Sequence, residues 1–295
     1  MKSLYRFVPL FLLVMLFSCT EDIVIDVEEG EPMIGVEGSF TDELRRHEVI
    51  LSYSADFYSG NHVRMISDAV VRVTDGVDTI AFLEQVDRPG HYLTDSVAGR
   101  KNTLYRLLVD VPDVAEPDGY KHLSAESFMK DNVEQIDSLV LKMSPLFEGV
   151  PLRDTIYMLY PYFQSLPDPT IVYMVHLFED SIPKSDTLYH VMSIPMAGYA
   201  GYYVNGPEML EQNVEIPVGM VLGSDLHDGE VFRLRLLSIP IDYMFFTVAV
   251  KTSLGSNPLL GPPTNVPTNI LPEGEAVGWF YAASVVTAET VYHKP

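Results

Sequence analysis

The chain has 295 residues, with 41 acidic and 19 basic side chains and a formal net charge of −22 at pH 7. This balance argues against binding to nucleic acid and against electrostatic adhesion to anionic lipid, because both need a basic surface. The length predicts about two domains. The single cysteine, Cys19, excludes an internal disulfide, so exported domains would depend on their hydrophobic cores for stability.

Residues 1–18 have the pattern of a secretory signal peptide. Two basic residues, Lys2 and Arg6, precede an apolar run from Phe7 to Phe17. The run is too short for a membrane-spanning helix, which needs about 20 apolar residues. It therefore predicts a signal that is removed from the mature protein, with cleavage just before Cys19.

The residues that end at the cysteine, Leu16-Phe17-Ser18-Cys19, resemble the lipobox of bacterial lipoproteins. This resemblance implies a diacylglyceryl cysteine that carries fatty acids such as palmitate. Two or more acyl chains anchor a protein stably, whereas one gives only marginal membrane binding. We therefore expect Cys19 to be the lipid anchor.

Residues 19–32 predict an acidic tether behind the anchor. Its carboxylates are those of Glu21, Asp22, Asp26, Glu28, Glu29 and Glu31. Acidic residues in this position resemble the signal that sends lipoproteins of the Bacteroidota to the outer face of the outer membrane. The alternative is a solvated tail, because blocks of like charge are commonly disordered. We expect the protein in the outer membrane, facing the cell exterior.

Residues 33–120 predict a first domain made of short antiparallel strands. Val49, Leu51 and Tyr53 share one face of a half-buried strand. Turn formers separate the expected strands, for example at Asp75-Gly76 and Pro89-Gly90. The expected strands cover residues 47–54, 69–74, 78–83, 91–94 and 104–111. Such a series indicates a β-sandwich of immunoglobulin-like or transthyretin-like kind.

Residues 121–295 predict a second, mainly β domain. The polar stretch 112–130 is rich in turn formers and predicts a linker between the domains. Residues 241–250 are apolar throughout, and periodicity leaves both a strand and a short buried helix open. Five prolines predict an irregular loop at residues 253–274. The expected strands cover residues 133–141, 171–178, 231–237 and 277–286. The fold class is therefore mainly β, with two β-sandwich domains in series behind a lipidated tether.

Several phrases, taken in order, resemble a Bacteroidota lipoprotein family known as domain of unknown function 4249. They are Ile34-Gly-Val-Glu-Gly-Ser-Phe-Thr-Asp42, Val49-Ile-Leu-Ser-Tyr53, Ser67-Asp-Ala-Val-Val-Arg-Val-Thr-Asp75, Pro89-Gly-His-Tyr-Leu-Thr-Asp95, Pro267-Thr-Asn-Ile270 and Gly278-Trp-Phe-Tyr-Ala282. The resemblance runs from Cys19 almost to the end. It implies a cell-envelope lipoprotein encoded near a TonB-dependent outer-membrane transporter, and it supplies no catalytic residues.

Motifs that carry catalysis or metal binding are not completed in this sequence. His47-Glu48 begins a zinc-protease pattern, but Leu51 stands where the second histidine is needed. The segment Asp225-Leu-His-Asp-Gly-Glu230 is rich in carboxylates, yet it lacks the spacing of a calcium loop and is typical of an exposed turn. We expect no catalytic residues, no metal site and no cofactor, so the protein is not expected to be an enzyme.

The strongest candidate for ligand binding is a glycine-rich segment with tyrosines at positions 199, 202 and 203. The rings of Tyr199, Tyr202 and Tyr203 could stack on a sugar or anchor a protein contact. The alternative is that they cover the core of a long hairpin. The leading hypothesis is a binding or accessory component of a TonB-dependent transporter. The alternative is a structural or adhesive cell-surface protein.

Overall fold

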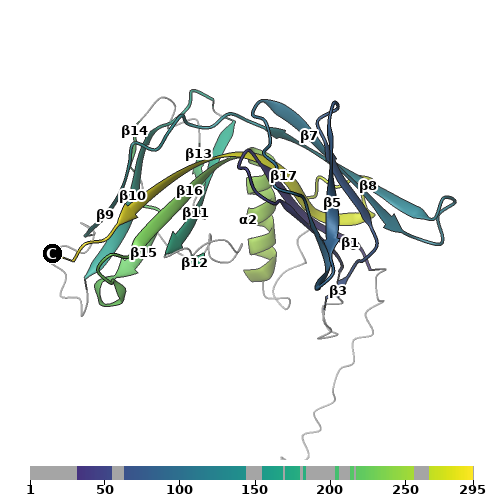
Figure 1. The fold of residues 1–295 in the computed structure, drawn as a ribbon, viewed down its shortest axis with the longest axis horizontal. Helices are drawn as coiled ribbons and strands as arrows, with labels where there is room; N and C mark the ends of the chain where they lie inside the picture. Colours follow the sequence, from purple (N-terminus) through teal and green to yellow (C-terminus); the bar gives the residue numbers. More distant parts are fainter. Residues whose placement is uncertain are drawn as a thin grey trace, which may run out of the picture. The chain divides into compact units, whose positions relative to one another are not determined.

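The computed structural model describes residues 32–54, 63–143, 155–168, 170–179, 182–183, 203–205, 213–215, 217–255 and 266–294. The chain divides into a unit of residues 1–31 and a compact unit of residues 32–295, to which all described residues belong. This second unit is mainly β, as the sequence predicts (Figure 1).

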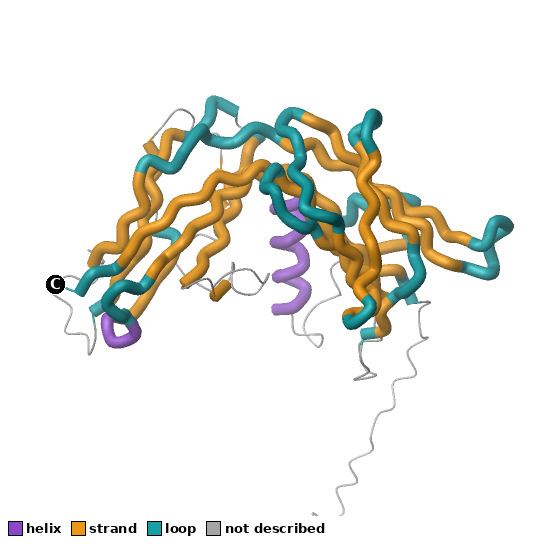
Figure 2. The backbone as a smooth tube through the Cα atoms, viewed as in Figure 1, coloured by secondary structure: helices purple, strands orange, loops and turns teal. Residues whose placement is uncertain are grey.

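A 13-stranded sheet dominates the described part of the chain (Figure 2). Its order is β12-β11-β16-β17-β1-β2-β6-β5-β4-β7-β8, with β13 beside β11 and β3 beside β2. The pair β1–β17 is parallel and the other pairs are antiparallel. The strands are β1 Ile34–Thr41, β2 Glu48–Tyr53, β3 Arg64–Met65, β4 Val70–Thr74, β5 Thr79–Gln85, β6 Arg88–Leu93, β7 Thr103–Pro112, β8 Tyr120–Met129, β11 Ile171–Glu179, β12 Ile182–Pro183, β13 Tyr203–Asn205, β16 Val231–Pro240 and β17 Ala276–Val291.

A second, 4-stranded sheet has β10 at its centre. The strand β9 pairs along one edge of β10, while β14 and β15 follow one another along the other edge. The strands are β9 Ser138–Met143, β10 Ile156–Gln164, β14 Asn213–Glu215 and β15 Gly219–Leu222, and the short helix η3 covers Gly223–Asp225.

The described residues form two large hydrophobic clusters. The first takes the inward side chains of β1, β2 and β4–β8; in β7 these are Tyr105, Leu107, Val109 and Val111. The second packs β10, β11 and β16 against the segment that leads into β9. Each fully buried aliphatic or aromatic side chain contributes about 1.5–3 kcal/mol through removal from water, so the clusters fix which face of each strand is inward.

The long strand β17 takes part in both clusters. Its first half pairs with β1, and its second half pairs with β16 from Ser284 onward. Phe280 and Ala282 pack in the first cluster, while Val286 and Ala288 pack against the second. Because one continuous strand serves both clusters, displacement of either cluster would strain β17.

The undecided segment at 241–250 is a helix. Helix α2 covers Ile241–Gly255 and begins directly after β16. Its apolar residues are not confined to one side, and Ile241, Tyr243 and Met244 pack against a third cluster formed by β11, β16 and β17. The helix extends into the predicted proline-rich loop; the described residues 266–275 of that loop form no long strand or helix, as predicted. Among the described helices, none has the length and apolar composition to cross a membrane.

Two local predictions are wrong. The stretch 112–130 contains the whole of β8, which pairs with β7 along its length, so it is not a polar linker. Pro89 and Gly90 lie inside β6, and the turn falls three residues earlier, at Val86 and Asp87. The inward side chains of β8, including Met129, therefore belong to the first hydrophobic cluster. The predicted boundary between a first domain of residues 33–120 and a second domain of residues 121–295 stays a prediction.

Two of the sequence segments that resemble the family, residues 267–270 and 278–282, contact one another. Asn269 donates hydrogen bonds from Nδ2 to the carbonyl oxygens of Phe280 (2.7 Å) and Glu126 (3.3 Å), and its Oδ1 accepts one from the Phe280 backbone N–H (3.0 Å). The Thr268 hydroxyl donates to the Gly278 carbonyl at 2.9 Å. The loop at 266–271 thus fastens β8 to β17, which gives these residues a structural role.

Candidate functional site on the sheet face beside helix α2

Four aromatic rings gather where α2 meets β17. The Tyr243 ring of α2 stacks on Tyr281 of β17, with centroids 4.2 Å apart. Phe246 of α2 lies 5.2 Å from Trp279 of β17. Trp279 is buried, whereas the other three are half-buried. These four residues, called the aromatic cluster below, leave part of their ring surface open to solvent.

One carboxylate stands beside this cluster. Strand β1 alternates, with Val36 and Gly38 turned toward the first hydrophobic cluster, so Glu37 lies on the opposite face. Glu37 is the register partner of Trp279. It is exposed; desolvation is the largest cause that raises its pKa, repulsion from Glu48 adds to the rise, and attraction to His91 opposes it. Glu37 and the aromatic cluster therefore share the face of the sheet away from the first hydrophobic cluster, called the α2 face below.

The residue pair next along the strands lies on the same face. Ser39 and Tyr281 are register partners. Burial raises the pKa of the Tyr281 hydroxyl, and the negative charge of Glu37 adds to the rise. The phenol is therefore neutral at physiological pH and acts as a hydrogen-bonding group.

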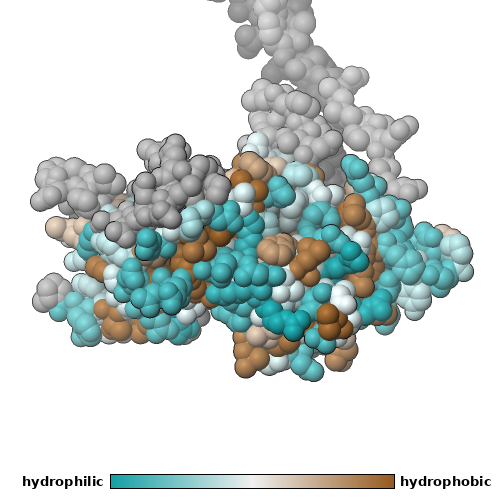
Figure 3. All heavy atoms as spheres, turned by 90° about the horizontal axis from the view of Figure 1, so that it is seen from above, coloured by the Kyte–Doolittle hydropathy of each residue, from teal (hydrophilic) through white to brown (hydrophobic). Residues whose placement is uncertain are grey.

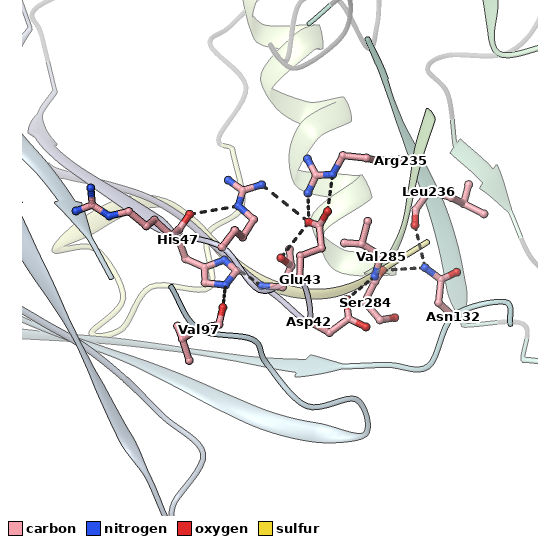
Figure 4. A network of polar contacts seen from close by, with 12 residues as sticks. Asp42, Glu43, His47, Val97, Asn132, Arg235, Leu236, Ser284 and Val285 are labelled. Carbon is pink, nitrogen blue, oxygen red and sulfur yellow. Dashed lines mark hydrogen bonds and ion pairs between the residues drawn. The ribbon is translucent and has the colours of Figure 1, made fainter. Parts of the chain in front are cut away.

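A network of ionic and polar contacts lies where β17 passes from one cluster to the other (Figure 4). Glu43, after β1, faces Arg235 of β16, and the two side chains form a bidentate ion pair with Nε–Oε1 at 3.1 Å. The Asp42 carboxylate accepts a hydrogen bond from the Val285 N–H at 2.7 Å. The Arg235 side chain is only 13% exposed, so the loss of its partner would leave a poorly solvated charge.

Asn132 completes this network from the segment between β8 and β9. Its Nδ2 donates to the carbonyl oxygens of Leu236 (2.9 Å) and Ser284 (2.8 Å), and its Oδ1 accepts from the Val133 N–H. The residue is 3% exposed. It thereby satisfies two backbone carbonyls of β16 and β17 that its loss would leave unpaired in a buried place.

Two buried histidines lie near the same junction. Burial lowers the pKa of His47 to about 4, and its ring accepts from the Thr41 N–H and donates to the Val97 carbonyl. Burial, together with the positive charges of Arg235 and Arg45, lowers the pKa of His176 to about 3. Both rings are neutral at physiological pH, so neither contributes a charge to the site.

Most of the predicted candidate residues cannot be placed on the α2 face. Cys19, Tyr199 and Tyr202 lie outside the described residues. Tyr203 belongs to β13, where its backbone pairs with Met174 of β11; its side chain is not described.

The segment 225–230 forms a turn in which the Glu230 carboxylate accepts a hydrogen bond from the His227 N–H. Across the described ranges, no group of three or more His, Cys, Asp and Glu side chains could hold a metal ion.

Sequence reasoning missed Glu37, Tyr243 and Phe246 as site residues. The alternation of buried and exposed positions along β1 places Glu37 on the face away from the first cluster. This alternation can be recognised in the sequence, so Glu37 could have been found from it. Tyr243 and Phe246 were out of reach, because their positions depend on the helical conformation of a segment whose periodicity is undecided.

The fold defines a mainly β protein in which two hydrophobic clusters share one strand, with an aromatic cluster between α2 and β17. The chain belongs to the family described as Domain of unknown function (DUF4249), whose model matches residues 20–289. A search of curated proteins gives no match. Among solved structures, a cytokine receptor complex (crystal form 1A) is similar at 11% identity over 70% of this chain and 84% of that chain, with a TM-score of 0.22. A likeness at this level carries no argument about function.

Proposed function

We propose that the protein is an outer-membrane lipoprotein of the Bacteroidota that acts as a non-catalytic binding or accessory component of a TonB-dependent transporter. The aromatic cluster with Glu37 on the α2 face is the observation that carries the binding role. Aromatic faces and a carboxylate are groups that recognise ligands or partner side chains. The paired strands β1 and β17 hold Glu37, Trp279 and Tyr281 on a rigid support.

The anchor is supported by the sequence before β1. Residues 20–33 separate Cys19 from the start of β1 at Ile34. A fully extended tether of that length spans at most about 50 Å. A lipid on Cys19 would thus keep the folded unit close to the membrane that holds it, facing the cell exterior, and within reach of a transporter in the same membrane.

The adhesive alternative would be favoured by a long, unpaired, apolar edge strand. The strand β8 stands at one end of the order of the large sheet. Its outer edge is occupied in part, because Ser124 bridges to Leu271 and the Glu126 carbonyl accepts from Asn269. In the view from above, hydrophobic residues form separate patches divided by hydrophilic ones (Figure 3). These features favour a binding role over strand addition.

A photo-crosslinking experiment in intact outer membranes tests this proposal. A photo-reactive phenylalanine analogue replaces Phe245, which is 55% exposed on α2, and in a matched control it replaces Val86, at the tip of the β5–β6 turn. We expect the Phe245 position to capture an outer-membrane transporter more efficiently than the Val86 position, and the Cys19→Ser variant to lose the capture. Recovery of no transporter from either position would remove the accessory role.

A further inference from the structure

His122 of β8 bridges two carboxylates at the end of the β7–β8 hairpin. Its Nδ1 lies 2.7 Å from Oδ1 of Asp110, its register partner on β7, and its Nε2 lies 2.8 Å from Oδ2 of Asp118 in the turn between the strands. The side chains of His122 and Asp118 are each 60% exposed, whereas that of Asp110 is 19% exposed. The bridge is therefore in contact with solvent, and protons from solvent can reach it.

The two contacts require the His122 ring to carry a positive charge. A neutral imidazole has one N–H donor and one lone pair, whereas an ionised carboxylate can only accept hydrogen bonds. Only the imidazolium ion can donate to Asp110 and Asp118 at once. In the neutral ring, one nitrogen lone pair would face a carboxylate oxygen, so one of the two contacts must be lost.

The contact with Asp118 is the weaker of the two. The Asp110 carboxylate is held from a second side, because Arg72 of β4 donates to its Oδ2 and β4 pairs with β7. Asp118 accepts a longer hydrogen bond, 3.2 Å, from the Tyr120 N–H, and its ion pair within the described residues is the one with His122. Loss of the proton from His122 therefore frees the turn and leaves the strands in place.

The electrostatic surroundings of His122 favour the charged ring. Its hydrogen bonds to Asp110 and then to Asp118 raise its pKa above the ordinary value of 6.5, and slight desolvation opposes the rise. In return, the hydrogen bond from His122 lowers the pKa of Asp118. The other charged side chains of the neighbouring elements are Arg72, Asp113 and Glu116 of the turn, and Lys121, which is paired with Glu275 at 3.5 Å.

We propose that residues 113–119 form a pH-sensitive latch, which protonated His122 fastens to β8 and which opens when the ring loses its proton. The latch stabilises the turn fully below the unfolded-state pKa of histidine, about 6.5, and this stabilisation is lost as the pH rises through the higher folded-state value. The turn carries the fully exposed Val114, so the latch controls a segment that partners can reach. The proposal goes beyond the binding role and depends neither on that role nor on the lipid anchor.

Hydrogen exchange of the full mature chain, purified in an uncharged sugar-headgroup detergent, tests the proposal at pH 6 and pH 8.5. The reporting groups are the backbone N–H groups that form hydrogen bonds in the turn, those of Asp113, Glu116, Gly119 and Tyr120. Their protection is corrected for the intrinsic pH dependence of exchange. We expect it to be roughly two- to fivefold lower at pH 8.5, the range that corresponds to one exposed ion pair.

Substitutions then assign the effect to the bridge. His122→Gln removes the titrating charge and Asp118→Asn removes its partner in the turn, so both variants should show at pH 6 the lower protection that the wild type has at pH 8.5. The matched control is His293→Gln, which removes an exposed histidine 3.7 Å from Asp228. This control should keep the full difference between the two pH values.

An NMR titration of the His122 ring measures the same equilibrium directly. We expect it to titrate above pH 6.5 in the wild type and at a lower pH in Asp118→Asn. Equal protection of the turn at both pH values, a pH difference that persists in His122→Gln, or titration of His122 at or below pH 6.5 would overturn the proposal.

Discussion

Replacement of Gly278 by alanine is expected to lower the free energy of unfolding by about 3–5 kcal/mol. Gly278 lies in β17 with φ +112°, a backbone conformation that L side chains rarely adopt. A Cβ atom added there would stand 2.0 Å from the Val36 carbonyl oxygen of β1. The clash is with backbone, so it can be relieved only by separating β1 from β17, the pair that joins the two hydrophobic clusters.

Gly76→Ala is the matched control for this prediction. Gly76 also has a positive φ, +87°, but nothing lies within 4 Å of the Cβ that would be added. Its replacement should cost only about 1–2 kcal/mol of backbone strain. Chemical denaturation of both variants measures the difference. If Gly278→Ala proved no less stable than Gly76→Ala, the close approach of β1 and β17 would be wrong.

Asn132→Asp is the second substitution with a large expected effect, a loss of about 3–5 kcal/mol at neutral pH. The change replaces an amide that donates to the Leu236 and Ser284 carbonyls with a carboxylate of the same shape. An ionised carboxylate cannot donate, and it would face two carbonyl oxygens in a buried place. The two carbonyls would lose their partner, and the new charge would have no cation beside it.

The pH dependence of this variant has a definite sign. Burial raises the pKa of the new carboxyl in the folded state above its unfolded value of about 3.9. The protonated form can donate one hydrogen bond, so the stability lost at neutral pH returns as the pH falls toward the unfolded pKa. Unfolding of variant and wild type is therefore compared at pH 7 and pH 4.5, and the gap should narrow at the lower pH.

The exposed Asp131→Asn change is the control for altered charge in the same segment. The Asp131 side chain is 55% exposed and lies 3.7 Å from Lys101, and such a surface pair contributes about 0–1 kcal/mol. A similar loss of stability in Asp131→Asn and Asn132→Asp would contradict the role given to the buried amide.

The strands of the first hydrophobic cluster could be predicted where apolar residues alternate with polar ones. β2, β4 and β7 fall close to their predicted ranges. The sequence did not predict β8, because its inward side chains include the small residues Ala125 and Ser127. These residues do not form a recognisable alternation of large apolar and polar side chains. A strand that packs small side chains against its neighbour leaves a weak pattern in the sequence.

The predicted turn at Pro89-Gly90 was wrong for a local reason. Gly90 has the positive φ expected of a turn residue, +77°, but it lies inside β6, beside an irregular register between β5 and β6. A Cβ added there would stand 2.8 Å from both the Leu51 carbonyl oxygen and the Met65 Cβ. The glycine is thus needed for close packing within the sheet, a role that the sequence does not separate from a turn.

The double use of β17 and the place of α2 could not be predicted from local patterns. A run such as Ala276–Val291 predicts a strand, but the identity of its neighbours depends on contacts with residues far away in sequence. β1 lies more than 200 positions before β17, and Asn132 reaches Ser284 across 152 positions of the chain. The α2 face is assembled only when these distant elements meet, so its residues could be found singly but not as a group.

The central claim, a folded unit held on a membrane through Cys19, is tested most directly by the intact mass of the protein extracted from membranes. The account predicts a chain that begins at Cys19 and carries the added mass of a diacylglyceryl group with its fatty acids. The Cys19→Ser variant should lack that mass and leave the membrane fraction or keep residues 1–18. A wild-type protein with an unmodified Cys19, or one that starts elsewhere, would contradict the account.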